Sequence, residues 1–87
     1  MDKTVSDIFT VLGTSTPDMV DLRDLEAPEP MEKVLLACSR LGDGEFFLAH
    51  LPRVPAMLFP HLETRGLSWW VHEEEDHSAL LLIRRNA

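Results

Sequence analysis

The first part of the chain carries apolar side chains at helical spacing. Four of them recur at i, i+3, i+4 and i+7: Val5, Ile8, Phe9 and Leu12. Such a stripe predicts a short amphipathic helix over residues 4–12. Gly13 ends this helix, and polar residues 14–17 follow as a linker. The pattern therefore divides the chain into an N-terminal helix and linker, residues 1–17, and a domain over residues 18–87.

Beyond residue 17 the apolar pattern alternates between strand and helix periods. It predicts strands at residues 19–23, 45–50, 67–72 and 79–85, and helices at residues 28–41 and 54–65. Pro60 inside the second of these helices is expected to distort or delay it, because proline lacks the backbone N–H. The loop at residues 73–77 holds no Gly or Asn, so a wide hairpin loop is expected. The order β-α-β-α-β-β predicts a two-layer α/β (α+β) sandwich, with a mixed four-stranded sheet and both helices on one face.

Large apolar side chains are expected on both faces of this sheet. Phe46 and Phe47 are adjacent, as are Trp69 and Trp70, and three leucines follow one another at 80–82. Because the helices cover one face, the second face keeps an apolar patch, which usually marks an interface or a ligand groove. The N-terminal helix is a candidate cover for this patch, within one chain or across a homodimer.

A family resemblance enters at residues 20–30, which read Val-Asp-Leu-Arg-Asp-Leu-Glu-Ala-Pro-Glu-Pro. This segment resembles the opening motif of the TusA-like (SirA-like) sulfur-carrier proteins, Leu-Asp-x-x-Gly-x-x-Cys-Pro-x-Pro. The motif positions here are Asp21, Arg23, Asp24, Leu25, Ala27, Pro28 and Pro30. Residues 55–66 are similar to Pro-x-x-Leu-x-x-x-Leu-x-x-Arg-Gly, a pattern of an uncharacterised bacterial branch of that superfamily. The resemblance covers residues 18–86 and implies the same β-α-β-α-β-β fold, with an accessory role near bacterial sulfur or redox metabolism.

Two positions depart from the carrier motif. In the carriers the motif cysteine accepts sulfur as a persulfide, at a helix N-terminus that stabilises the thiolate. Ala27 stands at that position and has no nucleophile, so carrier chemistry is excluded there. Asp24 replaces the motif glycine, and because Asp tolerates a left-handed conformation better than most residues, we expect the turn to survive without glycine. Cys38 lies on the apolar stripe with Leu35 and Leu41, so it is interpreted as a core residue and not as a substitute thiol.

Composition and charge exclude several classes of partner. The chain has 87 residues, of which 15 are acidic and 8 basic, for a formal net charge of −7. This balance disfavours nucleic acid, whose affinity depends on Lys and Arg contacts to phosphate. Six acids between residues 18 and 32 also repel anions from the predicted helix start there. No apolar run reaches the ~20 residues of a membrane span, and a lone cysteine favours a reducing compartment. We therefore expect a cytoplasmic protein that binds neither nucleic acid nor membrane.

The four histidines are the remaining candidates for chemistry: His50, His61, His72 and His77. None is spaced as a zinc-ligand pair, so we expect no metal, no cofactor and no catalytic residue. One geometry stays open, because His50 and His72 each end a predicted strand. If both share a sheet face with Trp70, they converge with a carboxylate of the acidic run at residues 73–76. Otherwise they are solvated strand-end residues, and the acidic run is a solvated hairpin tip.

These observations predict a non-enzymatic binding or accessory domain whose partner is a protein or a small ligand. One alternative is a metal- or haem-handling protein or enzyme that uses His50 and His72 near Trp70. Another is a structural homodimer whose sheet faces pair. Metal content after purification separates the first two interpretations, and molecular mass in solution separates the third.

Deletion of residues 1–16 should leave the domain folded and expose apolar sheet surface around Trp70. Burial of the N-terminal stripe contributes ~25 cal/mol per Å², but ordering the helix costs ~1–2 kcal/mol per residue. The two terms nearly cancel, so the helix should dock only marginally. The truncated protein should then bind hydrophobic dye more strongly or self-associate. Unchanged dye binding, tryptophan emission and mass in solution would show that the helix covers nothing.

Overall fold

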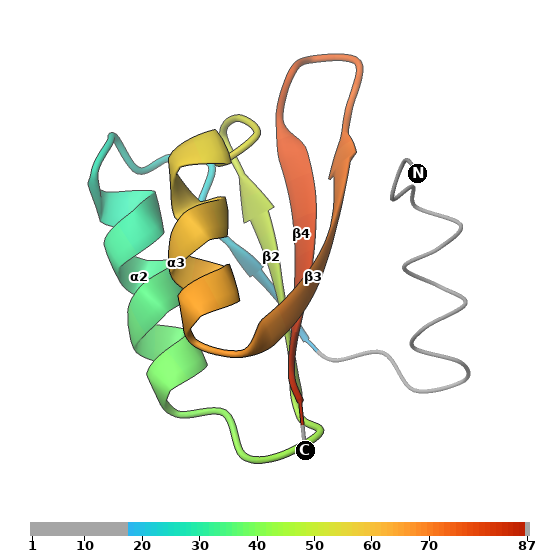
Figure 1. The fold of residues 1–87 in the computed structure, drawn as a ribbon. Helices are drawn as coiled ribbons and strands as arrows, with labels where there is room; N and C mark the ends of the chain where they lie inside the picture. Colours follow the sequence, from blue (N-terminus) through green and yellow to red (C-terminus); the bar gives the residue numbers. More distant parts are fainter. Residues whose placement is uncertain (1–17, 87) are drawn as a thin grey trace.

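The computed structural model describes residues 18–86, whose arrangement is shown in Figure 1. The elements follow in the order β1 (Met19–Asp21), α2 (Glu29–Ser39), β2 (Phe46–Leu51), the 3₁₀ turn η1 (Ala56–Leu58), α3 (Phe59–Thr64), β3 (Leu67–Glu73) and β4 (Ala79–Arg85). The helix predicted over residues 4–12 and its linker lie outside the described residues, and so does the cover expected of that helix.

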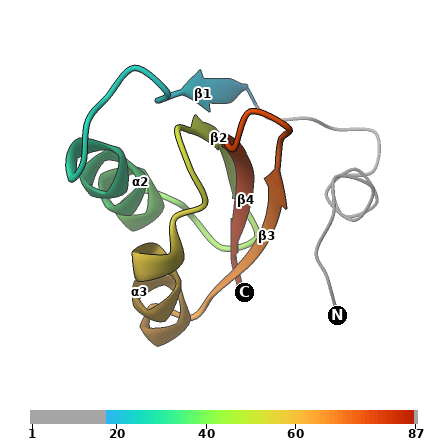
Figure 2. The same ribbon diagram turned by 90° about the horizontal axis from the view of Figure 1, so that it is seen from above.

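The strands form one four-stranded sheet in the order β1-β2-β4-β3. β1 pairs with β2 in parallel, with Val20 opposite Ala49, whereas β4 pairs antiparallel with both β2 and β3. Strand β4 therefore lies between β2 and β3, which run in the same direction without being neighbours. Both helices cover the same face of the sheet (Figure 2). The predicted two-layer fold with a mixed sheet is confirmed for the described residues.

The first strand and the first described helix are shorter than the pattern predicts. β1 ends at Asp21 and not at residue 23, because the Asp21 carboxylate accepts a hydrogen bond from the backbone N–H of Arg23 (3.1 Å) and turns the chain. Helix α2 ends at Ser39 and not at residue 41. Its last turn tightens there, since the N–H of Arg40 bonds back only three residues, to the carbonyl of Ala37 (3.1 Å).

The region predicted as one helix over residues 54–65 is divided. Ala56–Leu58 form a single 3₁₀ turn, and α3 begins only at Phe59. Pro60 lies in the first turn of α3, where a missing N–H breaks no helical hydrogen bond. The expectation that Pro60 delays the helix is confirmed, and the predicted start at residue 54 is wrong.

The core lies between the two helices and the sheet. Its buried residues are Leu22, Val34, Cys38, Ala49, Leu51, Leu58, Leu62, Leu67, Leu81 and Ile83. On the second face a smaller cluster forms around Leu48 and Leu82, packed against Phe46 and Trp70. Strand alternation separates the two sets, because successive side chains point to opposite faces. The prediction of large apolar groups on both faces is confirmed.

The loop between β3 and β4 is wide, as expected. Residues 74–78 connect the strands, and the N–H of Glu74 donates to the carbonyl of Ser78 (2.7 Å) at the base of the loop. His77 helps to reverse the chain with a φ of 73°, a left-handed conformation that is uncommon for residues other than glycine. The hairpin thus closes without Gly or Asn.

Cys38 is a core residue, as interpreted. Its side chain is fully buried against the sheet. Burial raises the pKa of its thiol to about 11, because the thiolate loses hydration there. Its backbone carbonyl accepts a hydrogen bond from the Arg85 guanidinium (2.7 Å), which ties the end of β4 to helix α2.

Cys38→Ala should lower the free energy of unfolding by about 1 kcal/mol, because it leaves a small cavity, and Cys38→Asp should cost several times more. Urea denaturation measures both, with half-exposed Leu36→Ala on the same helix as the control that changes stability least. The folded thiol ionises at a higher pH than the unfolded one. Its contribution to stability is therefore complete below pH 9.0 and is lost as the pH rises toward about 11. Fast labelling of the folded protein by a thiol reagent at neutral pH would contradict this burial.

Candidate functional site

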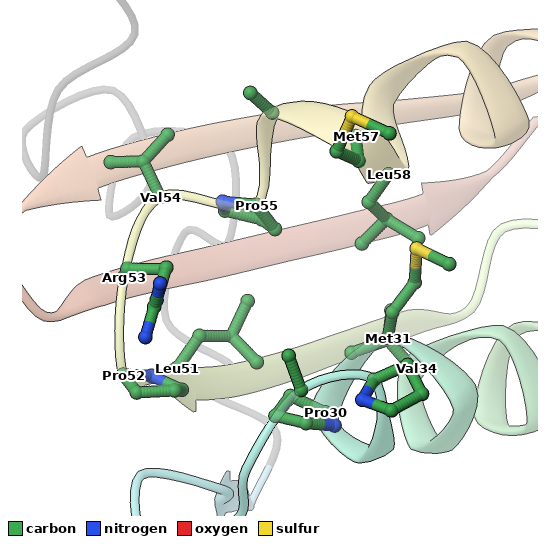
Figure 3. Close-up of a pocket in the computed structure, with 13 residues that line it drawn as sticks. Pro30, Met31, Val34, Leu51, Pro52, Arg53, Val54, Pro55, Met57 and Leu58 are labelled. Carbon is green, nitrogen blue, oxygen red and sulfur yellow. The ribbon is translucent and has the colours of Figure 1, made fainter.

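An apolar pocket of about 400 Å³ opens between the start of α2 and the chain that follows β2 (Figure 3). The first of these segments contributes Ala27, Pro28, Pro30, Met31 and Val34, and the second contributes Leu51, Pro52, Arg53, Val54, Pro55, Ala56, Met57 and Leu58. Figure 3 shows Val54, Pro55 and Met57 across the pocket from Pro30, Met31 and Val34, with Leu51 and Pro52 on the same side as Pro30. The site therefore depends on packing between segments that are distant in the sequence.

Four prolines shape the wall of this pocket. Pro28 and Pro30 flank the start of α2, where the fixed φ of proline suits the first helical turn. Pro52 follows the end of β2, and Pro55 directly precedes η1. Because proline has no backbone N–H, these residues present ring carbons and add no hydrogen-bond donor. The apolar character of the wall thus follows directly from the residue types.

The pocket has a buried floor and an open rim. Val34, Leu51 and Leu58 belong to the hydrophobic core and form the floor. Met57 stands at the rim with 81% of its surface exposed. Its unbranched thioether side chain adapts to neighbours of different shape. The pocket therefore combines a floor of buried core residues with an adaptable side chain at its rim.

Arg53 is the one charged side chain among the described residues that line this pocket. It lies on the loop between β2 and η1 and is exposed. Within residues 18–86 its side chain has no hydrogen-bond or ion-pair partner. All donors of the guanidinium are therefore free for a ligand at the edge of the pocket.

The motif positions divide between the pocket and the turn before it. Ala27, Pro28 and Pro30 line the pocket, where Ala27 contributes a methyl group. The other motif residues precede the pocket and do not line it: Asp21, Arg23, Asp24 and Leu25. Of these, Leu25 packs against the core. Only the second half of the motif therefore takes part in the site.

Asp21 and Arg23 form an exposed bidentate ion pair, with nitrogen–oxygen distances of 2.9 and 2.8 Å. The side-chain hydrogen bonds from Arg23 hold the pKa of the Asp21 carboxyl well below its usual range. The turn at Asp24 is kept without glycine, as expected, although Asp24 has a negative φ and does not use the left-handed conformation. The turn closes instead through the N–H of Leu25, which donates to the carbonyl of Leu22 (3.2 Å). An ordinary backbone at this position explains why glycine is not needed.

His50 and His72 lie on one face of the sheet. Both are opposite Leu80 of β4, from β2 and β3 respectively, so the three side chains form one row. Trp70 shares this face, two residues before His72 on the same strand. The two histidines line a second pocket of about 570 Å³ with Glu73, Glu74, Glu75, Asp76 and Ser78. Both histidines and the acidic run at residues 73–76 therefore line the same pocket.

The other two histidines are not among the residues that line either pocket. His61 is exposed on α3. His77 is exposed in the β3–β4 loop, where its Nδ1 lies 3.3 Å from the Glu73 carboxylate. No group of three His, Cys, Asp or Glu side chains within residues 18–86 is placed to hold a metal ion.

A chain of hydrogen bonds connects His50, Ser78 and Asp76 beside the second pocket. The Ser78 hydroxyl donates to the Asp76 carboxylate (2.6 Å), and His50 Nε2 lies 2.9 Å from the same hydroxyl oxygen. Because a hydroxyl has one proton, His50 Nε2 is the donor to Ser78. The hydrogen bonds from Ser78 also lower the pKa of Asp76. In a nucleophilic serine the hydroxyl donates to the histidine, so the order here fits a structural link between β2 and the loop.

The sequence pattern alone did not single out Arg53 and Met57 at the first pocket, or Ser78 at the second. Arg53 lies between the two prolines that interrupt the chain after β2, and that proline spacing was the available signal. No sequence pattern pointed to Ser78, because its hydrogen-bond partner His50 is 28 residues away in the chain.

Comparison with known families places both pockets within the segment that one family model matches. A family model described as an uncharacterized conserved protein (DUF2249) matches residues 19–85. The matched segment includes all residues that line the two pockets. A search of curated proteins gave no match. None of the helices within residues 18–86 is long and apolar enough to cross a bilayer.

Ser78→Ala should raise the pKa of Asp76 toward its ordinary value of 3.8, because the substitution removes the hydroxyl that donates to this carboxylate. The depressed pKa stabilises the fold above pH 3.8, and that contribution is lost as the pH falls. The variant should therefore be less stable than the parent at neutral pH, with a smaller difference in acid. Carboxyl NMR titration and urea denaturation measure the two effects, with exposed Ser39→Ala as the control. An unchanged Asp76 titration would show that the hydrogen bond is absent in solution.

Proposed function

The chain belongs to the DUF2249 family of uncharacterized conserved proteins, and from this premise we propose that it is a non-enzymatic domain that binds a small apolar ligand. The ligand enters the pocket between the start of α2 and the β2–η1 loop. The observation that carries the proposal is the pocket itself, with its apolar wall and its floor of core residues.

The size and lining of the pocket support binding of a small molecule. Ligand pockets in proteins typically span about 300–1,000 Å³ and combine mainly apolar walls with a few polar groups. This pocket has a volume of about 400 Å³, and its lining includes one charged side chain, Arg53. A compact organic molecule fits these limits better than a nucleotide, whose phosphates need several donors.

The likeness of residues 20–30 to TusA-like carriers supports the choice of this site. The carriers have their reactive cysteine at the position of Ala27, which lines the pocket here. Cys38 offers no replacement, because its thiol is buried and has a raised pKa. We infer that the domain is TusA-like, that it binds at the place where the carriers react, and that its role lies near bacterial sulfur or redox metabolism.

A second candidate function uses the other face of the sheet. His50 and His72 line one pocket near Trp70, which favours the handling of a metal or haem there. That pocket also contains four carboxylates, but the residues that the structure describes hold no group of three ligands arranged for a metal ion. The metal content of the purified protein tests this candidate. The mass of the protein in solution tests the homodimer.

Substitutions that fill the first pocket should weaken binding of a neutral apolar probe, N-phenyl-1-naphthylamine. Ala27 and Ala56 line the pocket at exposed positions, so Ala27→Leu and Ala56→Leu add volume without disturbing the core. Each should weaken the probe at least about tenfold, since several apolar contacts are lost. Fluorescence titration measures the Kd, and circular dichroism verifies the fold.

The matched control is Leu36→Ala, which changes a half-exposed side chain of α2 outside the pocket. It should leave the probe Kd within about twofold. No binding by the parent, or equal binding by the parent and both leucine variants, would refute the proposed site.

A further inference from the structure

We infer that the ligand is a small organic acid, whose apolar body occupies the first pocket and whose anionic group is bound by Arg53. This inference rests on the proposed function and specifies the ligand class that the pocket takes. It begins from the contrast within the lining, where one guanidinium stands among apolar side chains.

Arg53 differs from the arginines that have a structural role. Arg23 is paired with the Asp21 carboxylate, and Arg85 donates to the Cys38 carbonyl. Arg84 lies over the ring of Phe46, 5.7 Å from its centroid. Among the described residues Arg53 has no such contact, and neither do Arg40 and Arg65, but of these three arginines only Arg53 lines the apolar pocket. A ligand anion would supply Arg53 with a partner of the kind that Arg23, Arg84 and Arg85 find within the chain.

The start of α2 does not supply this anion contact by itself. Its first turn contains two prolines without N–H groups and two acids, Glu29 and Glu32. The negative charges of these acids reduce the positive potential at the N-terminus of the helix, so this end of the helix attracts an anionic ligand less strongly. Neither of them lines the pocket. Recognition of an anion is therefore left to Arg53 on the facing loop.

The net charge of −7 does not prevent anion binding at this position. At physiological ionic strength charges are screened beyond about 8 Å, so the groups in direct contact with the ligand dominate. Among residues 18–86, the ones that line the pocket include no carboxylate, and the one charge they contribute is positive. A guanidinium binds carboxylate, sulfonate or phosphate oxygens through two parallel hydrogen bonds. A cationic ligand would meet repulsion from Arg53 without a compensating contact.

Two probes with the same apolar body test this inference. 8-Anilinonaphthalene-1-sulfonate has the body of N-phenyl-1-naphthylamine and one additional sulfonate. Arg53→Gln should weaken the anionic probe about tenfold, because a charged hydrogen bond is lost, and should leave the neutral probe within about twofold. Arg53→Lys should recover part of the loss, since it restores the charge but not the planar fork.

Arg40→Gln is the matched control, because it removes the same charge from an exposed position outside the pocket. It should leave the ratio of the two dissociation constants unchanged. In the Ala56→Leu background, Arg53→Gln should no longer change the Kd of the anionic probe. That result would show that the anion is bound within the pocket. Failure of the neutral probe to bind the pocket would refute the proposed function. Pocket binding of the neutral probe, with equal probe ratios in Arg53→Gln and Arg40→Gln, would refute the acid specificity alone.

Discussion

Strand β4 is hydrogen-bonded along both edges, to β2 and to β3, and the rest of the fold is built around it. Its central residues Leu81, Leu82 and Ile83 are fully buried, although successive side chains point to opposite faces. Leu81 and Ile83 belong to the core beneath the helices, and Leu82 belongs to the smaller cluster on the second face. A polar residue at any of these positions would leave one layer without its packing partner. The burial of β4 on both faces is thus the constraint on which the sheet depends.

The end of β2 connects the two candidate sites. His50 and Leu51 are consecutive, so their side chains leave the sheet on opposite faces. Leu51 lies in the floor of the apolar pocket, whereas His50 lines the acidic pocket and bonds to Ser78. A single strand end therefore supports two environments of opposite chemistry. One is apolar with a single positive charge among its described lining residues, and the other is polar and rich in carboxylates.

The apolar pocket obtains its character from what its backbone lacks. Prolines 28, 30, 52 and 55 remove N–H donors from the wall, and Ala27 adds only a methyl group. In the proposed function a ligand binds beside Ala27, at the position where the TusA-like carriers have their reactive cysteine. Arg53 then contributes the specificity, because it is the charged group of the lining that a ligand can contact. The site needs no activated nucleophile for that role.

Within residues 18–86 the sequence by itself determined the order of the strands and helices and the faces of the strands, because local periodicity and proline positions are sufficient for these features. It also indicated that Cys38 is buried and that the β3–β4 loop is wide. The ends of β1 and α2 were not predicted correctly. They depend on single hydrogen bonds, from the N–H of Arg23 to Asp21 and from the N–H of Arg40 to Ala37, which the apolar pattern does not reveal.

Only the tertiary structure decided which elements are neighbours. The position of β4 between β2 and β3 depends on long-range hydrogen bonding, which leaves no periodic trace in the sequence. The apolar pocket is formed by residues 27–34 together with residues 51–58. Arg53 therefore becomes part of a pocket only after α2 packs opposite its loop. The link from His50 through Ser78 to Asp76 likewise forms because the hairpin returns β4 beside β2. Sites of this kind are contacts between distant segments, and folding alone brings their parts together.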